Sequence, residues 1–351
     1  MMNARFLRRD LHFIRPAVTS RGSLTLKETY FIELTDPGRP GVVGIGECAL
    51  FRGLGADDRP GYAEKVAELC DSINRGLPLP DLSDWSSIRF GLEMALASLA
   101  VGANGMVYPS DWTSGNGPGI TINGLVWMDS PDRMEAAAMA KAESGFHCIK
   151  FKIGACDFRA ELRMIERLRR RFGPDRVEIR LDANGAWRDD SEALRHLRDL
   201  APLDIHSLEQ PVKARQEELM QAVVANSPVD IALDEELIGR DPTREASELL
   251  SFIRPAYIIL KPSLCGGFSG AEQWIDAAMT LGIGHWATSA LESNVGLNAI
   301  AQWTARNGIP SMPQGLGTGA LYLDNLSAGL RLDGEMLHCV PAGPWESPFV
   351  K

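Results

Sequence analysis

Two lysines lie one residue apart in the apolar stretch His147-Cys148-Ile149-Lys150-Phe151-Lys152-Ile153-Gly154, which ends at a glycine. Apolar and polar residues alternate along it, and this pattern predicts a β-strand on which residues two apart share a face. The apolar residues would face a packed layer, while Lys150 and Lys152 would lie side by side on the opposite face. Two neighbouring ammonium groups, buried together, favour the loss of one proton, so one lysine could act as a neutral base. In isolation the same pattern is more often a solvated edge strand.

On both sides of this stretch, short apolar runs alternate with helical patterns between residues 118 and 320. The runs end at steps of 25 to 30 residues, namely at Asn123, Lys152, Asp182, Glu209, Asp234, Lys261, Ser289 and about Gly315. A period of this length accommodates one strand, one loop and one helix, and eight successive strand ends predict a closed β/α barrel. A doubly wound open sheet is the alternative, but it would not usually place a polar residue at the carboxyl end of nearly every strand.

The first hundred or so residues have a different pattern. Alternation predicts strands over residues 5–15, 27–35 and 42–47, and apolar residues at helical spacing predict helices over residues 62–74 and 88–99. Polar, glycine-containing loops at residues 19–23 and 51–55 follow the first and the third strand. The order of strands and then helices predicts an α+β domain. The tail from residue 321 to 351 has no strong period, and we expect it to pack back on this first domain.

Composition excludes several classes of partner. The formal net charge of -10 gives no electrostatic surface for nucleic acid or for an anionic membrane, so we expect neither as a partner. The 6 cysteines are scattered without a Cys-x-x-Cys pair, which favours reduced thiols and a cytoplasmic location. The N-terminus lacks the apolar core of a signal peptide, and no run of about 18 apolar residues occurs. The sequence leaves the oligomeric state open, a homo-oligomer included.

Acidic residues end three consecutive predicted strands. In a barrel the carboxyl ends of all strands gather on one face, so Asp182, Glu209 and Asp234 should converge within reach of a single ion. Ligation by oxygen alone, without histidine or cysteine, favours Mg²⁺, with Mn²⁺ next. Any one of these acids could instead cap the N-terminus of a helix. The lysines on the flanking strands favour the interpretation that the three acids belong to one site.

The spread pattern resembles the enolase superfamily, in the branch of the muconate cycloisomerases, on the motifs Lys150-Phe151-Lys152, Asp182-Ala183-Asn184, Glu209-Gln210-Pro211, Asp234-Glu235 and Lys261-Pro262. The resemblance covers the whole chain. It implies a (β/α)7β-type TIM barrel over residues 118–320 and an α+β capping domain over residues 1–117, on which the tail 321–351 packs. It also implies that the site takes a small-molecule carboxylate as its substrate.

The resemblance assigns roles to individual residues. A Mg²⁺ ion held by the three acids can bind a substrate carboxylate and stabilise the enediolate formed when the adjacent carbon loses its proton. Lys152 is then the candidate base, and Lys261 faces the other side of the substrate. Two lysines on opposite faces permit racemisation, whereas a base on one face with a cationic stabiliser on the other permits syn elimination. Both reactions stay open. The predicted substrate-binding residues are Lys150, Asn184, Arg21, Ser289, Gly315 and Gly317.

Within the superfamily, the sequence resembles the o-succinylbenzoate synthases most, at Thr19-Ser20-Arg21-Gly22, Gly46-Glu47-Cys48, Arg52-Gly53-Leu54, Thr288 to Ser293 and Gly315-Leu316-Gly317-Thr318-Gly319. Dipeptide epimerases need an acid near the last strand to hold an ammonium group, and no acid occurs between Glu292 and Asp324. The resemblance implies Mg²⁺-dependent loss of water from 2-succinyl-6-hydroxy-2,4-cyclohexadiene-1-carboxylate, a step of menaquinone formation. The alternatives are an N-succinylamino acid racemase, another epimerase or cycloisomerase of the superfamily and, more remotely, a non-catalytic binding protein on the same fold.

Overall fold

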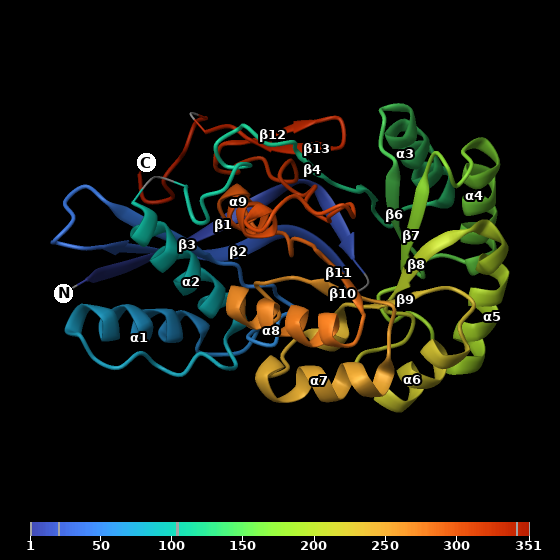
Figure 1. Cartoon of the computed structure of the whole chain (residues 1–351), viewed down its shortest axis with the longest axis horizontal. Coiled ribbons are helices and arrows are strands. Elements are labelled where there is room, and N and C mark those ends of the chain that lie inside the picture. Colours follow the sequence, from blue (N-terminus) through green and yellow to red (C-terminus); the bar gives the residue numbers. More distant parts are fainter. Residues whose placement is uncertain (1, 20–21, 103–104, 342, 351) are drawn as a thin grey trace.

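The computed structural model describes the chain except for residues 1, 20, 21, 103, 104, 342 and 351, and its two parts lie side by side (Figure 1). The first part contains an antiparallel sheet in the order β1-β2-β3, formed by β1 (Asn3–Thr19), β2 (Gly22–Thr35) and β3 (Val43–Cys48). Helices α1 (Tyr62–Arg75) and α2 (Ser86–Val101) follow and pack on this sheet. The order of strands and then helices is the one that the sequence predicts.

The hairpin of β1 and β2 is longer than the predicted strands at residues 5–15 and 27–35. Pairing continues from Asn3 opposite Thr35 to Thr19 opposite Gly22, with a shift of register between His12 and Ala17. Pro16 lies within the shift, and its missing N–H cannot donate to the ladder. Because this irregular part lacks strict alternation, the sequence pattern ends before the strand does.

Helix α2 lies directly on β3 because glycines of β3 lie at the contact. A Cβ atom at Gly46 would lie 1.8 Å from the carbonyl oxygen of Gly91, and one at Gly44 would lie 2.1 Å from that of Ala95. Only a residue without a side chain allows backbones to approach so closely. The glycines therefore fix how the helix lies on the sheet of the first part.

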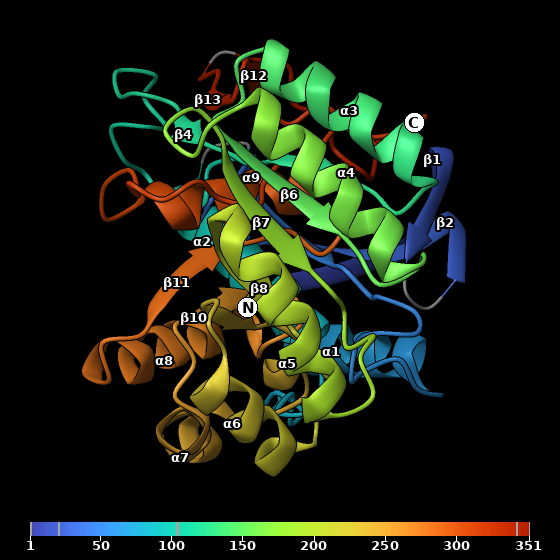
Figure 2. The ribbon, with the colours of Figure 1, turned by 90° about the vertical axis from the view of Figure 1, so that its right-hand side faces the viewer.

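The second part is a parallel sheet that curls in the order β5-β6-β7-β8-β9-β10-β11. Its strands are β5 (Gly124–Val126), β6 (Cys148–Lys152), β7 (Glu178–Asp182), β8 (Ile205–Glu209), β9 (Ile231–Leu233), β10 (Tyr257–Leu260) and β11 (Gly284–Ala287). The helices are α3 (Pro131–Glu143), α4 (Phe158–Arg171), α5 (Asp190–Leu200), α6 (Glu217–Asn226), α7 (Pro242–Ile253), α8 (Gly267–Thr280) and α9 (Asn294–Ala305), with 3₁₀ turns at Ala201–Leu203 and Glu235–Leu237. Helices α3 to α6 lie outside the sheet (Figure 2).

Two short bridges close the sheet into a barrel. Gln314 pairs in parallel with Ile122, and Gly315 pairs in parallel with Thr288, so the eighth strand is reduced to this segment. The first barrel strand runs on to Val126, whereas the sequence pattern placed its end at Asn123. Gly124, which follows Asn123, is part of the strand, and a Cβ atom there would lie only 2.8 Å from the Cδ atom of Lys141. The observed sheet is the barrel that the sequence predicts, with its eighth position shortened.

The C-terminal tail contacts both parts. Ile14 donates a backbone hydrogen bond to Leu321, and Leu323 donates one to His12, which ties the tail to β1. The hairpin of β12 (Leu330–Asp333) and β13 (Met336–Cys339) pairs instead with β4 (Ile120–Thr121), the short strand before β5. The domain limits 1–117, 118–320 and 321–351 stay a prediction. None of the helices in the described residues is long and apolar enough to span a membrane.

Candidate functional site

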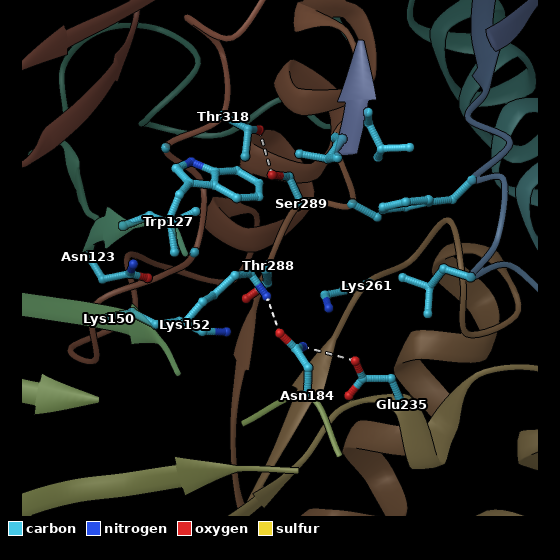
Figure 3. A pocket seen from close by; sticks show the side chains of 18 of the residues that line it. Asn123, Trp127, Lys150, Lys152, Asn184, Glu235, Lys261, Thr288, Ser289 and Thr318 are labelled. Atoms are coloured by element: carbon cyan, nitrogen blue, oxygen red, sulfur yellow. Dashed lines mark hydrogen bonds between the residues drawn. The ribbon is translucent and has the colours of Figure 1, made fainter. Parts of the chain in front are cut away.

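A pocket lies where the carboxyl ends of the barrel strands meet the first part of the chain (Figure 3). It contains about 990 Å³ of space between atoms, its open mouth included. Lysines from β6 and from the loop after β10 lie on one side of it, and apolar side chains from several distant segments lie on the other. We call the first group, with the acids that pair with it, the charged side: Lys150, Lys152, Asp182, Glu209, Asp234 and Lys261.

The alternation along β6 places both lysines in the pocket. Ile149, Phe151 and Ile153 are fully buried in the core between sheet and helices, and the two lysines line the pocket. Lys150 donates a hydrogen bond to Glu209 at 2.5 Å and lies 3.1 Å from Asp182. Lys152 donates to Asp182 at 2.8 Å. The strand is therefore not a solvated edge.

Neighbouring carboxylates balance the charge of Lys150. Burial alone would lower the pKa of Lys150, but the charges of Asp182 and Glu209 outweigh it, and its pKa lies above the ordinary value. Burial would likewise raise the pKa of Asp182, but Lys150 and Lys152 together hold it well below its usual range. Lys150 is thus held as an ammonium ion by its acidic neighbours.

Three acids lie at the carboxyl ends of neighbouring strands, and each is at most 2% exposed. Asp182 ends β7, Glu209 ends β8 and Asp234 follows β9. Burial raises the pKa of Glu209 well above its ordinary value, and the nearby charge of Asp182 raises it further. Lys261 forms an ion pair with Asp234. Burial works against the Lys261 ammonium, but Asp234 and then Glu209 outweigh it and raise its pKa. The three acids therefore lie close enough to interact electrostatically.

The chemistry of these acids fits a hard divalent cation. The Oε1 atom of Glu209 is buried and has no hydrogen-bond partner among the described residues, so it is available as a ligand. As they stand, no three Asp, Glu, His or Cys side chains in the described part of the chain converge closely enough to hold a metal ion. Lysine ammonium groups contact the same carboxylates instead. Oxygen donors of this kind suit Mg²⁺.

Asn184 connects Lys152 to a further acid. It adopts a left-handed backbone conformation with φ +46°, and its own N–H donates to Asp182 at 3.0 Å. Its side-chain oxygen accepts from Lys152 at 2.9 Å, and its side-chain nitrogen donates to Glu235 at 3.0 Å (Figure 3). Burial, and next the charge of Asp234, raise the pKa of Glu235. Asn184 therefore orients the Lys152 ammonium.

The predicted residues of the last strands also line the pocket. Ser289, Gly315 and Gly317 all do so, and the Ser289 hydroxyl shares a 2.6 Å hydrogen bond with Thr318. A Cβ atom at Gly315 would lie 2.4 Å from the Thr288 hydroxyl, so this position requires a glycine. Arg21, the remaining predicted residue, lies outside the described residues.

The structure adds pocket residues to those that the sequence predicted to bind substrate. The Oγ1 atom of Thr288 and the Oδ1 atom of Asn123 are buried at the pocket without a hydrogen-bond partner among the described residues. Thr288 belongs to the motif Thr288 to Ser293 that the sequence analysis quoted, and it continues the inward face of β11. Trp127 and Leu24 carry no such signal, since only the tertiary fold brings their segments together.

The loop that follows β3 covers part of the pocket. Phe51, Arg52, Gly53 and Leu54 all line it. Arg52 donates to Glu28 at 3.0 Å and to Asp58 at 2.7 Å, so its guanidinium is fixed by acids of the first part. Among the described lining residues, Arg52, Lys150, Lys152 and Lys261 are cationic and Glu235 alone is acidic.

Comparison with known proteins agrees with this geometry. The model of the family described as enolase C-terminal domain-like matches residues 132–316. The o-succinylbenzoate synthase of Desulfotalea psychrophila is 42% identical over 96% of this chain and 98% of its own length. The crystal structure of MenC from Desulfotalea psychrophila LSv54 superposes with a TM-score of 0.85 at 40% identity, and the match covers 96% of this chain and 99% of that one.

A more distant solved structure shares the fold. The dipeptide epimerase of Enterococcus faecalis, complexed with Mg and the dipeptide L-Leu-L-Tyr, superposes with a TM-score of 0.77 at 20% identity. The match covers 96% of each chain. A barrel with a capping domain of this kind therefore occurs in proteins with more than one activity, and the pocket has to distinguish between them.

Proposed function

The chain belongs to the enolase superfamily, and on that basis we propose that it is an o-succinylbenzoate synthase. Its reaction is the syn dehydration of 2-succinyl-6-hydroxy-2,4-cyclohexadiene-1-carboxylate to 2-succinylbenzoate, a step of menaquinone formation. The similarity to the synthase of Desulfotalea psychrophila over nearly the whole of both chains supports this choice.

The observation that carries the proposal is the charge of the pocket. The cationic residues Arg52, Lys150, Lys152 and Lys261 face a substrate that has two carboxylates, and the apolar side of the pocket suits its ring. Glu235 is the acidic lining residue among those described, and it already accepts a hydrogen bond from Asn184. Its other oxygen, Oε2, is buried and has no partner among the described residues, so the lining of the pocket does not by itself exclude the ammonium group of a dipeptide. The absence of any acid between Glu292 and Asp324, near the last strands, disfavours dipeptide epimerisation.

The metal ion would be Mg²⁺, or Mn²⁺ as the next choice, and its ligands would be Asp182, Glu209 and Asp234. The charge of the bound ion would stabilise the negative charge that develops on the substrate carboxylate. Lys152 takes the proton from the carbon adjacent to that carboxylate and returns a proton to the departing hydroxyl on the same face. Lys261 follows β10, which β7, β8 and β9 separate from β6, so it approaches from the other side as an ammonium group paired with Asp234. Closure of the loop at Phe51 would exclude water.

N-succinylamino acid racemisation is the second candidate, because one observation favours it. Lys152 and Lys261 both line the same pocket from strands on different sides of the barrel, which is the arrangement that two-sided proton transfer needs. A non-catalytic binding protein is disfavoured, since a binding role would not need the paired lysines and acids of the charged side.

The test is to supply the purified protein with Mg²⁺ and either the cyclohexadiene acid or a panel of N-succinylamino acids. We expect efficient formation of 2-succinylbenzoate, followed by its absorbance, and slower racemisation. Uptake of deuterium from solvent at the acidic carbon reports proton transfer in both cases. Efficient racemisation with poor dehydration would favour the second candidate, and the absence of both reactions would refute the proposal.

Two finer expectations accompany this function. A substrate of this kind is a small soluble dianion, which agrees with the predicted cytoplasmic location. The homo-oligomer and that location stay predictions, and sedimentation and cell fractionation would test them.

A further inference from the structure

The apolar side of the pocket, which we call the roof, consists of Leu24, Phe51, Trp127 and Leu291. These side chains come from β2, from the loop after β3, from the end of β5 and from the loop after β11. They pack in one cluster with buried residues of β1 and the tail, among them Phe13 and Tyr322. The shape of the roof therefore depends on contacts between segments that are far apart in the chain.

Leu291 is the strained member of the roof. Its φ of +63° lies in the left-handed region, which is unfavourable for a residue with a Cβ atom. Such a conformation persists only where the surroundings impose it, and it recurs at functional sites. The structure therefore has to supply contacts that hold this loop in place.

Two of these contacts come from the barrel and the tail. Tyr322 donates a hydrogen bond from its hydroxyl to the carbonyl oxygen of Leu291 at 2.7 Å. The N–H of Ala290 donates to Glu292 at 2.6 Å, and Ser263 donates to the same carboxylate at 2.5 Å. Glu292 is fully buried, so these bonds are shielded from water.

The third contact comes from the first part of the chain, through Lys27 of β2. This lysine is 4% exposed, yet its hydrogen bonds go to carbonyl oxygens rather than to carboxylates. Its ammonium group donates to Ala290 at 3.1 Å and to Ala49 at 3.5 Å, and it lies 4.8 Å from the centre of the Phe51 ring. One buried cation thus joins the loop that carries Leu291 to the loop that carries Phe51.

We infer that Lys27 is a positioning residue that holds these two loops at a fixed spacing, and that it thereby sets the width of the roof and the preference of the pocket for a ring-shaped carboxylate. The inference rests on the proposed function for the identity of the substrate. Burial of an ammonium group is costly and would not persist for packing alone. Burial lowers the pKa of Lys27 below its ordinary value, and the nearby carboxylates of Glu292, Glu47 and Asp57 offset part of that cost.

A matched control exists in the same interface. Glu93 of α2 is a half-buried acid that also joins the two parts, because its carboxylate accepts from the N–H groups of Phe268 at 2.6 Å and Ser269 at 3.2 Å, at the start of α8. It does not line the pocket. Loss of Glu93 should weaken the attachment of the first part without reshaping the roof.

The experiment compares Lys27→Met, Lys27→Arg and Glu93→Gln with the parent protein. Each is assayed for Tm, for kcat and KM in the dehydration, and for amide hydrogen exchange of the peptide that covers residues 288–293. For Lys27→Met we expect a KM raised about tenfold or more, kcat within about threefold of the parent, and faster exchange of that peptide. Lys27→Arg should recover part of the KM, since a guanidinium can donate to both carbonyl oxygens.

Glu93→Gln should lower Tm but leave KM and the exchange of residues 288–293 at the parent values. The inference is overturned if Lys27→Met lowers only Tm, or if Glu93→Gln raises KM as much. Should Lys27→Met not fold, Tyr322→Phe removes the other bond to the same loop, and an unchanged KM and unchanged exchange would then refute the inference. If the parent protein dehydrates nothing, the proposed function fails, while the exchange data still decide the role of Lys27.

Discussion

The charged side and the roof of the pocket are built in different ways. The charged side comes from neighbouring strands of one sheet, and its lysines pair with acids of the same sheet. The roof comes from segments around residues 24, 51, 127 and 291, which meet only when the first part docks on the barrel. We infer that chemistry and selectivity are separate: a change on the charged side should act on kcat, and a change on the roof should act on KM.

The largest effect should follow from Lys152→Arg. Arginine keeps the charge but cannot become a neutral base near pH 7, so we expect the dehydration rate to fall by about 10³-fold or more. Lys261→Arg should retain more activity, because that lysine is needed only as a cation. Lys213→Arg, an exposed position beside the barrel mouth, is the control. The measurement is kcat with the cyclohexadiene acid, and substantial turnover by Lys152→Arg would mean that another group is the base.

A smaller loss is expected when Lys152 is present but no longer oriented. Asn184→Gly removes the side chain that bonds both Lys152 and Glu235, and glycine tolerates the positive φ at this position without strain. We expect kcat to fall roughly 10- to 100-fold with KM and Tm little changed. Steady-state kinetics together with thermal unfolding test this, and a parent-like kcat would show that Asn184 does not orient the base.

The largest expected losses of activity concern the charged side, and this is the side of the pocket that the sequence could predict. Strand ends repeat every 25 to 30 residues, so the sequence pattern by itself places Lys152, Asp182 and Glu209 on one face of a barrel. Alternation also predicted the burial of Phe151. These features depend on local patterns and on the symmetry of the barrel.

The roof could not be predicted in the same way. In the sequence, Lys27 occupies an ordinary polar position of an alternating strand. No neighbouring residue indicates that its ammonium group donates a hydrogen bond to Ala290, 263 positions away. The positive φ of Leu291 has no sequence signal, because leucine rarely adopts it. The full length of the β1–β2 hairpin was missed because its pattern is irregular around Pro16. Contacts between distant segments decide these features, and local patterns do not encode them.

The hydroxyls near the last strands should have modest and unequal effects. Thr288 has an Oγ1 atom at the pocket without a partner among the described residues, so it is available to bind substrate, whereas the Ser289 hydroxyl is already bonded to Thr318. We expect Thr288→Val to raise KM about tenfold and Ser289→Ala to raise it by only about two- to threefold. Parallel KM measurements on both variants test this, and the reverse order would place the substrate nearer to Ser289.

The smallest effect should come from Glu28, which fixes Arg52 at the pocket mouth. Burial acts to raise the pKa of Glu28, but hydrogen bonds from Tyr30 and Arg52 outweigh it and lower the pKa below its ordinary value. A carboxyl whose pKa is lowered by folding stabilises the protein at neutral pH, and this contribution is lost as the pH falls through the folded pKa. Glu28→Gln should therefore cost about 1 kcal/mol or less near pH 7 and nothing in strong acid. Urea unfolding of both proteins across pH tests this, and a difference independent of pH would contradict it.

The most direct test of the charged side is the dehydration rate of the metal-stripped protein as Mg²⁺ is added back, measured beside Glu209→Gln. Asp182, Glu209 and Asp234 lie at or just after the carboxyl ends of three neighbouring strands, and we propose that they hold the ion. We therefore expect no turnover after chelation and a saturable recovery with Mg²⁺ in the parent protein. Glu209→Gln should need far more Mg²⁺ or not recover at all, since one oxygen ligand loses its charge. A full rate after thorough chelation, or a parent-like Mg²⁺ dependence in Glu209→Gln, would contradict the assignment of these acids.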